Sequence, residues 1–243
     1  MKNLRIMLLA TLCLALLGTQ ALAREVIVTR IDNPDIEFSG VETPRQDCQV
    51  GNLNAPAYAI TDWVYGNEVY GLIFDPLATC TCPLGFHVES VHMYMQFGAE
   101  DVPATFEAFV NLAEADFDPD SGCWLPGTEV CVGEVYSITI DTAGLYDISL
   151  PLGESCECAA MEYMYMLSFH FVTAFPTGMN PDAVSDDIPT NCTSWNDYGT
   201  GWVDLVFDIG WPGNISIYAD VICCEFPVGD ADNTWGGIKN LYR

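Results

Sequence analysis

The chain has 243 residues, half of them apolar, and 34 acidic side chains against 7 basic ones give it a formal net charge of −27. The apolar share excludes a disordered body. The acidity disfavours nucleic acids and anionic membrane surfaces as partners, because like charges repel. We therefore expect a solvated acidic shell, or a surface that binds a cation, with Ca²⁺ as the cation that oxygen ligands favour.

The first 23 residues have the layout of a secretory signal peptide. Lys2 and Arg5 give a positive start, Ile6–Leu17 is an apolar run too short to span a bilayer, and Ala21–Ala23 is a small-residue cleavage pattern. We expect a mature chain that starts near Arg24 and contains no transmembrane segment. Its expected location is extracellular or at the cell surface, with the periplasm as an alternative.

Ten cysteines follow the signal, and an even number in an exported chain predicts up to five disulfides. Two Cys-x-Cys pairs stand out, Cys80 with Cys82 and Cys156 with Cys158. Residues i and i+2 share one face of a strand, so these pairs are expected to form a ladder of two disulfides. A zinc–thiolate cluster is the alternative, but zinc ligands are usually spaced more widely.

Two more cysteines are adjacent, Cys223 and Cys224. In a strand they would face opposite ways, so they need separate partners. Cys48 and Cys192, both in expected loops, are the candidates for at least one of them.

The N-terminal third predicts strands separated by a loop. Arg24–Ile31 is β-branched and suits a first or edge strand. Asp32–Asn54 is expected to be a loop because proline and glycine interrupt it. Ala57–Phe74 predicts two strands that form a hairpin around Gly66-Asn67, a favourable turn pair.

The stretch Cys80–Phe97 is expected to form the middle of the fold. Its first apolar residues share a strand face with Val88, and its later ones share a face with Val91, which would be the opposite face of a regular strand. Such a change of face within one strand predicts a β-bulge near Glu89 and Ser90.

The remaining strands follow from short runs of alternating apolar residues. Glu162–Ala174 is apolar on both faces, which predicts a central strand. Pro176–Thr200 is expected to be a long loop. The other expected strands are Thr105–Leu112, Val135–Ile140, Leu145–Leu150, Trp202–Phe207 and Ile215–Cys224.

Together these elements predict an all-β fold, a single disulfide-rich antiparallel β-sandwich over residues 24–227. The order of an Asp-rich loop, a Gly-Tyr strand and a Tyr-rich strand over residues 85–225 resembles the jelly-roll accessory domains of secreted bacterial proteins. Residues 228–243 are expected to be a linker and a short C-terminal tail. The tail resembles the W-G-x-x-K-x-x-Y-R endings of uncharacterised exported bacterial proteins, which implies kinship and no activity.

An acidic segment, Asp116–Gly127, is expected to be a loop whose exit is closed by a local disulfide between Cys123 and Cys131. It lacks the glycine and the final glutamate of an EF-hand. A looser Ca²⁺ loop is therefore the hypothesis, and Ca²⁺ is the only cofactor we consider. Its ligands would be the alternating aspartates Asp116, Asp118 and Asp120.

Aromatic and polar side chains are densest near residues 195–211. Sugars bind by laying a C–H face on an aromatic ring while amides and carboxylates bond the hydroxyls, and loops on a rigid sandwich are common places for such sites. The alternative is that the rings cap the core or brace the long loop. The candidate ligand-binding residues are Trp195, Asn196, Asp197, Tyr198, Trp202 and Trp211.

Catalytic motifs are missing: the chain has no G-x-S-x-G, P-loop or dinucleotide fingerprint. His87, Glu89 and His92 do not match H-E-x-x-H, and we assign no catalytic residue. We expect a non-catalytic binding or adhesion module whose partner is a glycan or another cell-surface component. A self-associating subunit of an extracellular layer or fibre is the alternative. A polysaccharide hydrolase with a carboxylate pair is a second alternative.

Overall fold

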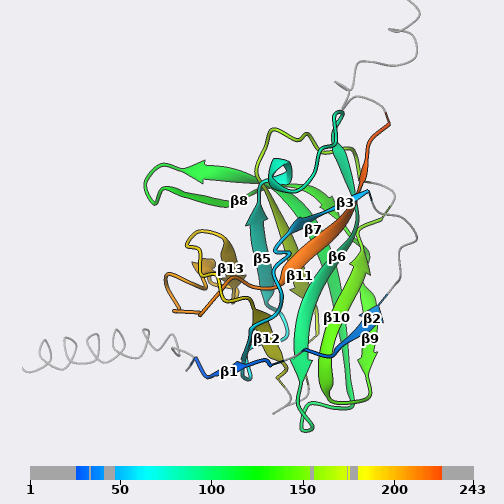
Figure 1. Cartoon of the computed structure of the whole chain (residues 1–243), viewed down its shortest axis with the longest axis vertical. Helices are drawn as coiled ribbons and strands as arrows, with labels where there is room; N and C mark the ends of the chain where they lie inside the picture. The colour runs from blue at the N-terminus through cyan, green and yellow to red at the C-terminus, as the bar shows by residue number, and fades with distance from the viewer. Residues whose placement is uncertain are drawn as a thin grey trace, which may run out of the picture.

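Two sheets lie face to face in the computed structural model of this chain, which describes residues 26–32, 34–40, 47–153, 156–173, 175 and 180–225 (Figure 1). The expected all-β, disulfide-rich sandwich is confirmed. The expected signal peptide and C-terminal tail lie outside the described residues and stay predictions. No helix in the described ranges is long and apolar enough to cross a membrane.

The first sheet, called sheet A, has the order β1-β4-β12-β6-β10-β2 in the described chain, and β15 pairs with both β6 and β3. All of its pairings are antiparallel except that of β2 with β10. Its strands are β1 (Val28–Arg30), β2 (Ile36–Gly40), β3 (Cys48–Gly51), β4 (Tyr58–Ile60), β6 (Phe86–Phe97), β10 (Gly144–Pro151), β12 (Asp182–Ser185) and β15 (Ile217–Cys223).

The second sheet, called sheet B, has the order β14-β13-β5-β11-β7-β8, and β9 pairs with β7. A short 3-10 helix, η1 (Pro76–Ala78), follows β5. The strands of sheet B are β5 (Val69–Phe74), β7 (Ala104–Asp118), β8 (Cys123–Val132), β9 (Tyr136–Ile140), β11 (Tyr165–Phe171), β13 (Ser194–Asp197) and β14 (Trp202–Asp204).

The core fills the space between the sheets with alternate side chains of facing strands. On β6 the expected bulge is confirmed: Asp220 pairs with Ser90 and Val221 with Val88, which leaves Glu89 as the extra residue. The bulge keeps Val88 and Val91 both in the core although they differ in parity. On β11 both faces are buried, as the sequence predicts for a central strand.

One expected hairpin is wrong, because β4 and β5 belong to different sheets. The segment between them crosses the sandwich and buries Trp63 and Val64. The Tyr70 hydroxyl donates to the Trp63 carbonyl at 2.9 Å and holds this crossing in place. Asn67 does adopt the left-handed conformation that a turn needs, with φ of 63°.

Two expected loops also contain strands. β2 and β3 lie within Asp32–Asn54, and β12 and β13 lie within Pro176–Thr200. These strands have four or five residues, so each is too short to show a clear alternation of apolar residues.

Ten cysteines form five disulfides, as expected, with Cα–Cα distances between 5.0 and 6.3 Å. Cys223 and Cys224 have separate partners, which confirms that prediction. The pairs are Cys48–Cys80, Cys82–Cys223, Cys123–Cys192, Cys131–Cys156 and Cys158–Cys224.

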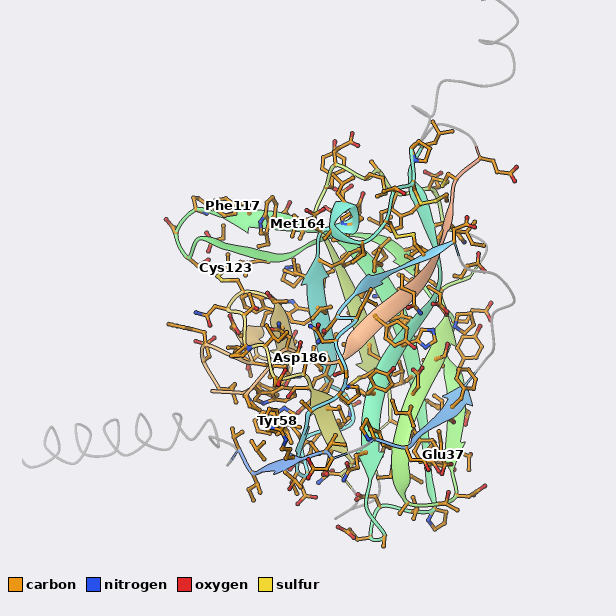
Figure 2. The ribbon with its side chains drawn as sticks, in the orientation of Figure 1. Glu37, Tyr58, Phe117, Cys123, Met164 and Asp186 are labelled. Carbon is orange, nitrogen blue, oxygen red and sulfur yellow. A yellow bond between two sulfur atoms is a disulfide. The ribbon has the colours of Figure 1, made fainter. Side chains whose placement is uncertain are left out.

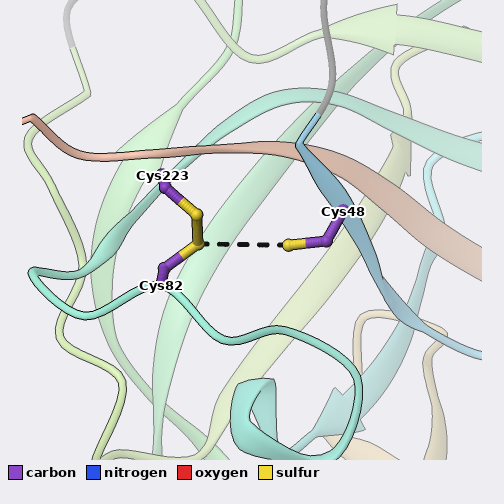
Figure 3. Close-up of side chains that lie close together, drawn as sticks. All are labelled: Cys48, Cys82 and Cys223. Atoms are coloured by element: carbon purple, nitrogen blue, oxygen red, sulfur yellow. Dashed lines mark hydrogen bonds between the residues drawn. A yellow bond between two sulfur atoms is a disulfide. The ribbon is translucent and has the colours of Figure 1, made fainter.

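Three expected pairings are wrong: the two-rung ladder, the local Cys123–Cys131 bridge, and Cys48 or Cys192 as a partner of Cys223 or Cys224. The reason is that each bridge joins segments that sheet pairing or packing brings together, not segments with similar spacing. Figure 3 shows Cys48 beside the Cys82–Cys223 bridge, with the Cys48 and Cys82 sulfurs 4.0 Å apart.

Candidate functional site

A pocket lies between the β7–β8 hairpin and the segment around β13 and β14. The hairpin projects from the body of the sandwich (Figure 1), and the labels of Figure 2 place Phe117 and Cys123 on its two sides. Most of the expected Asp116–Gly127 loop is therefore strand, with a turn at residues 119–122. The Cys123–Cys192 disulfide ties the hairpin to the start of β13.

We call this space the hairpin pocket. Its volume is about 460 Å³. Both apolar side chains and hydrogen-bonding groups line it, among them Asp118, Leu125, Asn191, Trp195, Phe207 and Asp208.

Trp195 forms the inner wall of the hairpin pocket. Its side chain is 5 % exposed and packs with Ile73, Ala115 and Met166 on the outer face of sheet B. Trp195 pairs with Gly71 on β5, where a Cβ atom would lie 1.7 Å from the Met166 Cε. The absence of a side chain at Gly71 thus leaves the room that Met166 occupies beside the Trp195 ring. Within the described residues the Trp195 Nε1 has no hydrogen-bond partner.

The carboxylates of the pocket are held by backbone amides. Asp204 is buried and accepts from the amides of Val206 at 2.9 Å and Phe207 at 3.1 Å, and also from that of Cys192. Asp208 accepts from the Asp204 amide at 2.9 Å. These bonds fix the loop that carries Phe207.

Asp118 lies at the other side of the pocket. It accepts from the Ser121 hydroxyl at 2.6 Å and from the Asp120 amide at 3.1 Å. These hydrogen bonds, led by that from Ser121, lower the pKa of Asp118, so its carboxylate is ionised at neutral pH. The residues that line the pocket include no Lys, Arg or His.

Of the six candidate sugar-binding residues, only Trp195 lines the hairpin pocket. Asn196 is fully buried, and its Nδ2 donates to the Val69 carbonyl at 2.9 Å. Asp197 accepts from the amides of Gly199 and Gly201 and braces the turn between β13 and β14. Each of these two side chains therefore has at least one atom engaged in a hydrogen bond within the fold.

The three aromatic candidates beyond β13 also pack against other side chains of the fold. Trp211 is buried and meets Trp63 edge to face, with ring centroids 5.5 Å apart. Tyr198 is partly buried against the main core. Trp202 packs on the Trp195 cluster. This arrangement matches the alternative interpretation, in which the rings brace the loop and the end of the core.

The aspartates of the D-x-D-x-D run do not gather around a point. In the described ranges, the group of three metal-ligand side chains whose ligand atoms lie within 4.8 Å of one another is Cys48, Cys82 and Cys223. Those sulfurs are all in disulfides, which leaves no thiolate for a metal. Asp118 instead caps its own turn.

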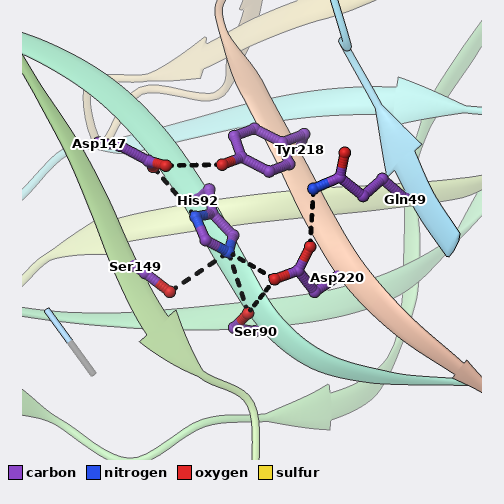
Figure 4. A network of polar contacts seen from close by, with 7 residues as sticks. All are labelled: Gln49, Ser90, His92, Asp147, Ser149, Tyr218 and Asp220. Atoms are coloured by element: carbon purple, nitrogen blue, oxygen red, sulfur yellow. Dashed lines mark hydrogen bonds and ion pairs between the residues drawn. The ribbon is translucent and has the colours of Figure 1, made fainter. Parts of the chain in front are cut away.

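A second cluster, which sequence reasoning missed, surrounds His92 on the outer face of sheet A (Figure 4). The His92 Nδ1 lies 3.0 Å from Asp147, and its Nε2 lies 3.2 Å from Asp220. The Tyr218 ring stacks on the imidazole with centroids 4.3 Å apart. Burial alone would lower the pKa of His92, but the hydrogen bonds to Asp147 and Asp220 raise it to about 9.

Ser90, His92 and Asp147 have the hydrogen-bonding order of a catalytic triad, with Ser90 Oγ 3.0 Å from the His92 Nε2. Two features argue against catalysis by these three residues. Ser90 is fully buried, so a substrate cannot reach its hydroxyl. His92 lies between two carboxylates and keeps its proton at neutral pH, so it cannot act as the general base.

The signal for this cluster was present in the sequence as pairs of polar residues two apart. Ser90 and His92 lie on β6, Asp147 and Ser149 on β10, and Tyr218 and Asp220 on β15. Residues two apart share one face of a strand. The sequence does not show that β6 lies between β10 and β15 in the sheet, and this arrangement brings the six polar residues together.

A family model described as "Domain of unknown function (DUF7451)" matches residues 47–221. The chain belongs to this family. The DUF7451 match includes the residues of the hairpin pocket and of the His92 cluster. Among curated proteins, none matches this chain.

One solved structure with a similar chain path holds the cysteine protease and lectin-like domains of Cwp84, a surface-layer-associated protein of Clostridium difficile. The TM-score is 0.46 and the sequence identity 13 %. The likeness covers 75 % of this chain and 37 % of that chain.

Proposed function

We propose that this protein is a secreted or cell-surface binding module without catalytic activity, and that its ligand is a carbohydrate held in the hairpin pocket. The observation that carries the proposal is the composition of that pocket. Leu125, Trp195 and Phe207 give an apolar wall, while Asp118, Asn191 and Asp208 give hydrogen-bonding groups beside it. A sugar needs both kinds of surface, because its ring has an apolar C–H face and a rim of hydroxyls.

Pre-organisation supports the same proposal. The disulfide Cys123–Cys192 fixes the two sides of the pocket, and backbone amides hold Asp204 and Asp208. A rigid site loses little conformational entropy when a ligand binds, which favours affinity. Five disulfides also suit an oxidising compartment outside the cytoplasm, where glycans are available as ligands.

The test uses Phe207, whose side chain is 72 % exposed and lines the pocket. The wild-type protein is screened on a glycan array, and the affinity for a retained glycan is then measured by calorimetry. We expect Phe207→Ala to lower the affinity about tenfold, because an aromatic contact of this kind contributes about 1–2 kcal/mol. Since Phe207 is exposed, the melting temperature should not change.

The matched control is Ile188→Ala, which also removes an exposed apolar side chain but one that does not line the pocket. It should bind like the wild type. The proposal fails if no glycan is retained, or if Phe207→Ala binds as tightly as the control.

An alternative function, a subunit of an extracellular layer or fibre, has one observation in its favour. The edge strands β1 and β2 and their surroundings carry exposed apolar side chains, among them Ile27, Ile36 and Phe38. Exposed edges of this kind can pair with a second chain. Sedimentation of the same wild-type sample distinguishes the two, because a series of ordered oligomers without glycan binding would favour the subunit.

A further inference from the structure

We propose a second ligand site on the outer face of sheet A, shaped for a single neutral sugar ring. It is a pocket of about 210 Å³, called the sheet-A pocket, and it is lined by Gln49, Asn52, Leu53, Asn54, Tyr94 and Tyr218. None of these residues lines the hairpin pocket, which lies against sheet B. The site is therefore independent of the function proposed above.

Strand pairing brings the walls of the sheet-A pocket together. Tyr218 on β15 pairs with His92 on β6 and with Gly51 on β3. A Cβ atom at Gly51 would lie 2.8 Å from the Ile217 carbonyl oxygen, and the φ of this residue is +100°. Glycine thus lets β3 approach β15 closely before the chain turns into the segment that holds Asn52 and Asn54.

The amide side chains of the pocket are fixed by buried partners. The Asn52 Nδ2 donates to the carbonyls of Asn214 at 3.2 Å and Ile215 at 3.1 Å. The Asn54 Nδ2 donates to the Asn52 Oδ1 at 3.0 Å and to Asp186 at 2.8 Å. Since both hydrogens of the Asn54 amide are used, the group that it offers to a ligand is its carbonyl oxygen, an acceptor for a hydroxyl.

The His92 cluster fixes the opposite wall (Figure 4). Tyr218 stacks on His92, and its hydroxyl donates to Asp147 at 2.6 Å. The Gln49 Nε2 donates to Asp220 at 2.9 Å. A buried charge network gives a fold little more net stability than apolar residues of the same volume would give. Here it holds two pocket side chains in single positions, which is what a binding site requires.

The chemistry of the walls indicates the class of ligand. Tyr94 is half-buried and offers aromatic surface for a sugar C–H face, and its ring lies 5.8 Å from that of the buried Tyr218, tilted by 36°. The lining contains no Lys, Arg or His that could neutralise an anion. The volume lies below the range of about 300–1,000 Å³ that larger ligands need. One uncharged, hydroxyl-rich ring meets all three conditions.

The experiment follows the side-chain amide signals of Gln49, Asn52 and Asn54 by ¹⁵N-resolved NMR in the full chain. The probes are glucose, galactose, mannose and N-acetylglucosamine, with glucuronate as the anionic comparison. We expect at least one neutral sugar to shift these signals at millimolar concentration, and glucuronate to leave them unchanged. Because Tyr94 supplies aromatic contact, Tyr94→Ala should weaken the binding about tenfold.

Asn54→Ala provides a second variant, and because it removes one donor from the buried Asp186 carboxylate, its melting temperature is measured beside the binding. It should weaken the binding of the same sugar, whereas Phe207→Ala in the hairpin pocket should leave the titration unchanged. The inference is overturned if no neutral sugar shifts the three amides, or if the shifts persist in both Tyr94→Ala and Asn54→Ala. A glycan that still binds through Phe207 would then leave the proposed function intact.

Discussion

His92 and His170 show how one side-chain type acquires opposite properties from its surroundings. His92 faces two carboxylates, so its imidazolium is stabilised and the pKa rises to about 9. His170 stacks on Phe109 with centroids 4.4 Å apart, and its Nε2 meets the Ser168 hydroxyl at 2.9 Å. Burial therefore dominates there and lowers the pKa of His170 to about 4. At neutral pH the first is charged and the second is not.

The stability of the fold should depend on the charge of His92. Its folded pKa of about 9 lies above the unfolded value of 6.5, so its contribution is complete below pH 6.5 and is lost as the pH rises to about 9. The loss should be about 3 kcal/mol, since each pKa unit corresponds to about 1.4 kcal/mol. The measurement is the free energy of unfolding in urea across this pH range.

The tyrosines near the imidazole do not titrate in this pH range. Asp147 and Asp220 are the carboxylates that stabilise the imidazolium. Burial raises the pKa of Tyr94 and Tyr218 above 10.0, outside the range. In His92→Gln the alkaline loss should disappear, whereas His170→Gln should keep it. An equal loss in wild type and His92→Gln would show that His92 does not carry this pH dependence.

At the scale of elements, the β7–β8 hairpin shows where the alternation of apolar residues no longer predicts a strand. Alternation identifies the inner half of β7, where Phe106, Ala108 and Val110 are buried. Register shifts near Ala113 then interrupt the regular pairing with β8. Beyond them Phe117 and Trp124 pair at 5.4 Å but stay exposed. A hairpin that leaves the core no longer buries alternate residues, so the sequence predicts a loop there.

The same limit applies to the sites. The bulge at Glu89 could be predicted because the apolar residues of β6 before and after it are on opposite parities and must all face one core. The disulfide pairs could not, because Cys82 and Cys223 are 141 residues apart and only strand pairing brings them together. Trp195 could be identified as a wall residue, but not the neighbours that make its pocket, Leu125 and Phe207. Leu125 lies in the expected Asp116–Gly127 loop and Phe207 at the end of an expected strand, and nothing in the sequence places either of them beside Trp195.

The Cys123–Cys192 disulfide should matter for binding as well as stability. In the double variant Cys123→Ser/Cys192→Ser the hairpin is no longer tied to β13, so glycan affinity in the hairpin pocket should fall about tenfold as pre-organisation is lost. Removal of a native disulfide should also cost about 2–5 kcal/mol of stability. Calorimetric titration and thermal melts measure the two effects.

The matched control is Cys82→Ser/Cys223→Ser, which opens a bridge on the side of sheet A. It should lose stability within the same range and keep the glycan affinity of the folded protein. Equal affinities in the two double variants would contradict a positioning role for Cys123–Cys192.

At the scale of the whole molecule, nearly all of the charge has one sign, negative. In the described ranges Arg30 is the only Lys or Arg, and it pairs with Asp32 at 3.6 Å. Both pockets therefore lie in a negative field with no basic side chain in their linings. Such a field disfavours anionic ligands, and the repulsion between the negative side chains destabilises the compact state.

Salt should accordingly stabilise the fold. Raising NaCl from about 0.01 M to about 1 M shortens the Debye length from about 30 Å to about 3 Å, which screens the repulsion and should raise the melting temperature by several degrees. Because Asp116, Asp118 and Asp120 do not gather around a point, CaCl₂ and MgCl₂ at equal ionic strength should act alike. A larger rise with Ca²⁺, absent in Asp118→Asn, would instead show that a calcium loop assembles when the ion binds.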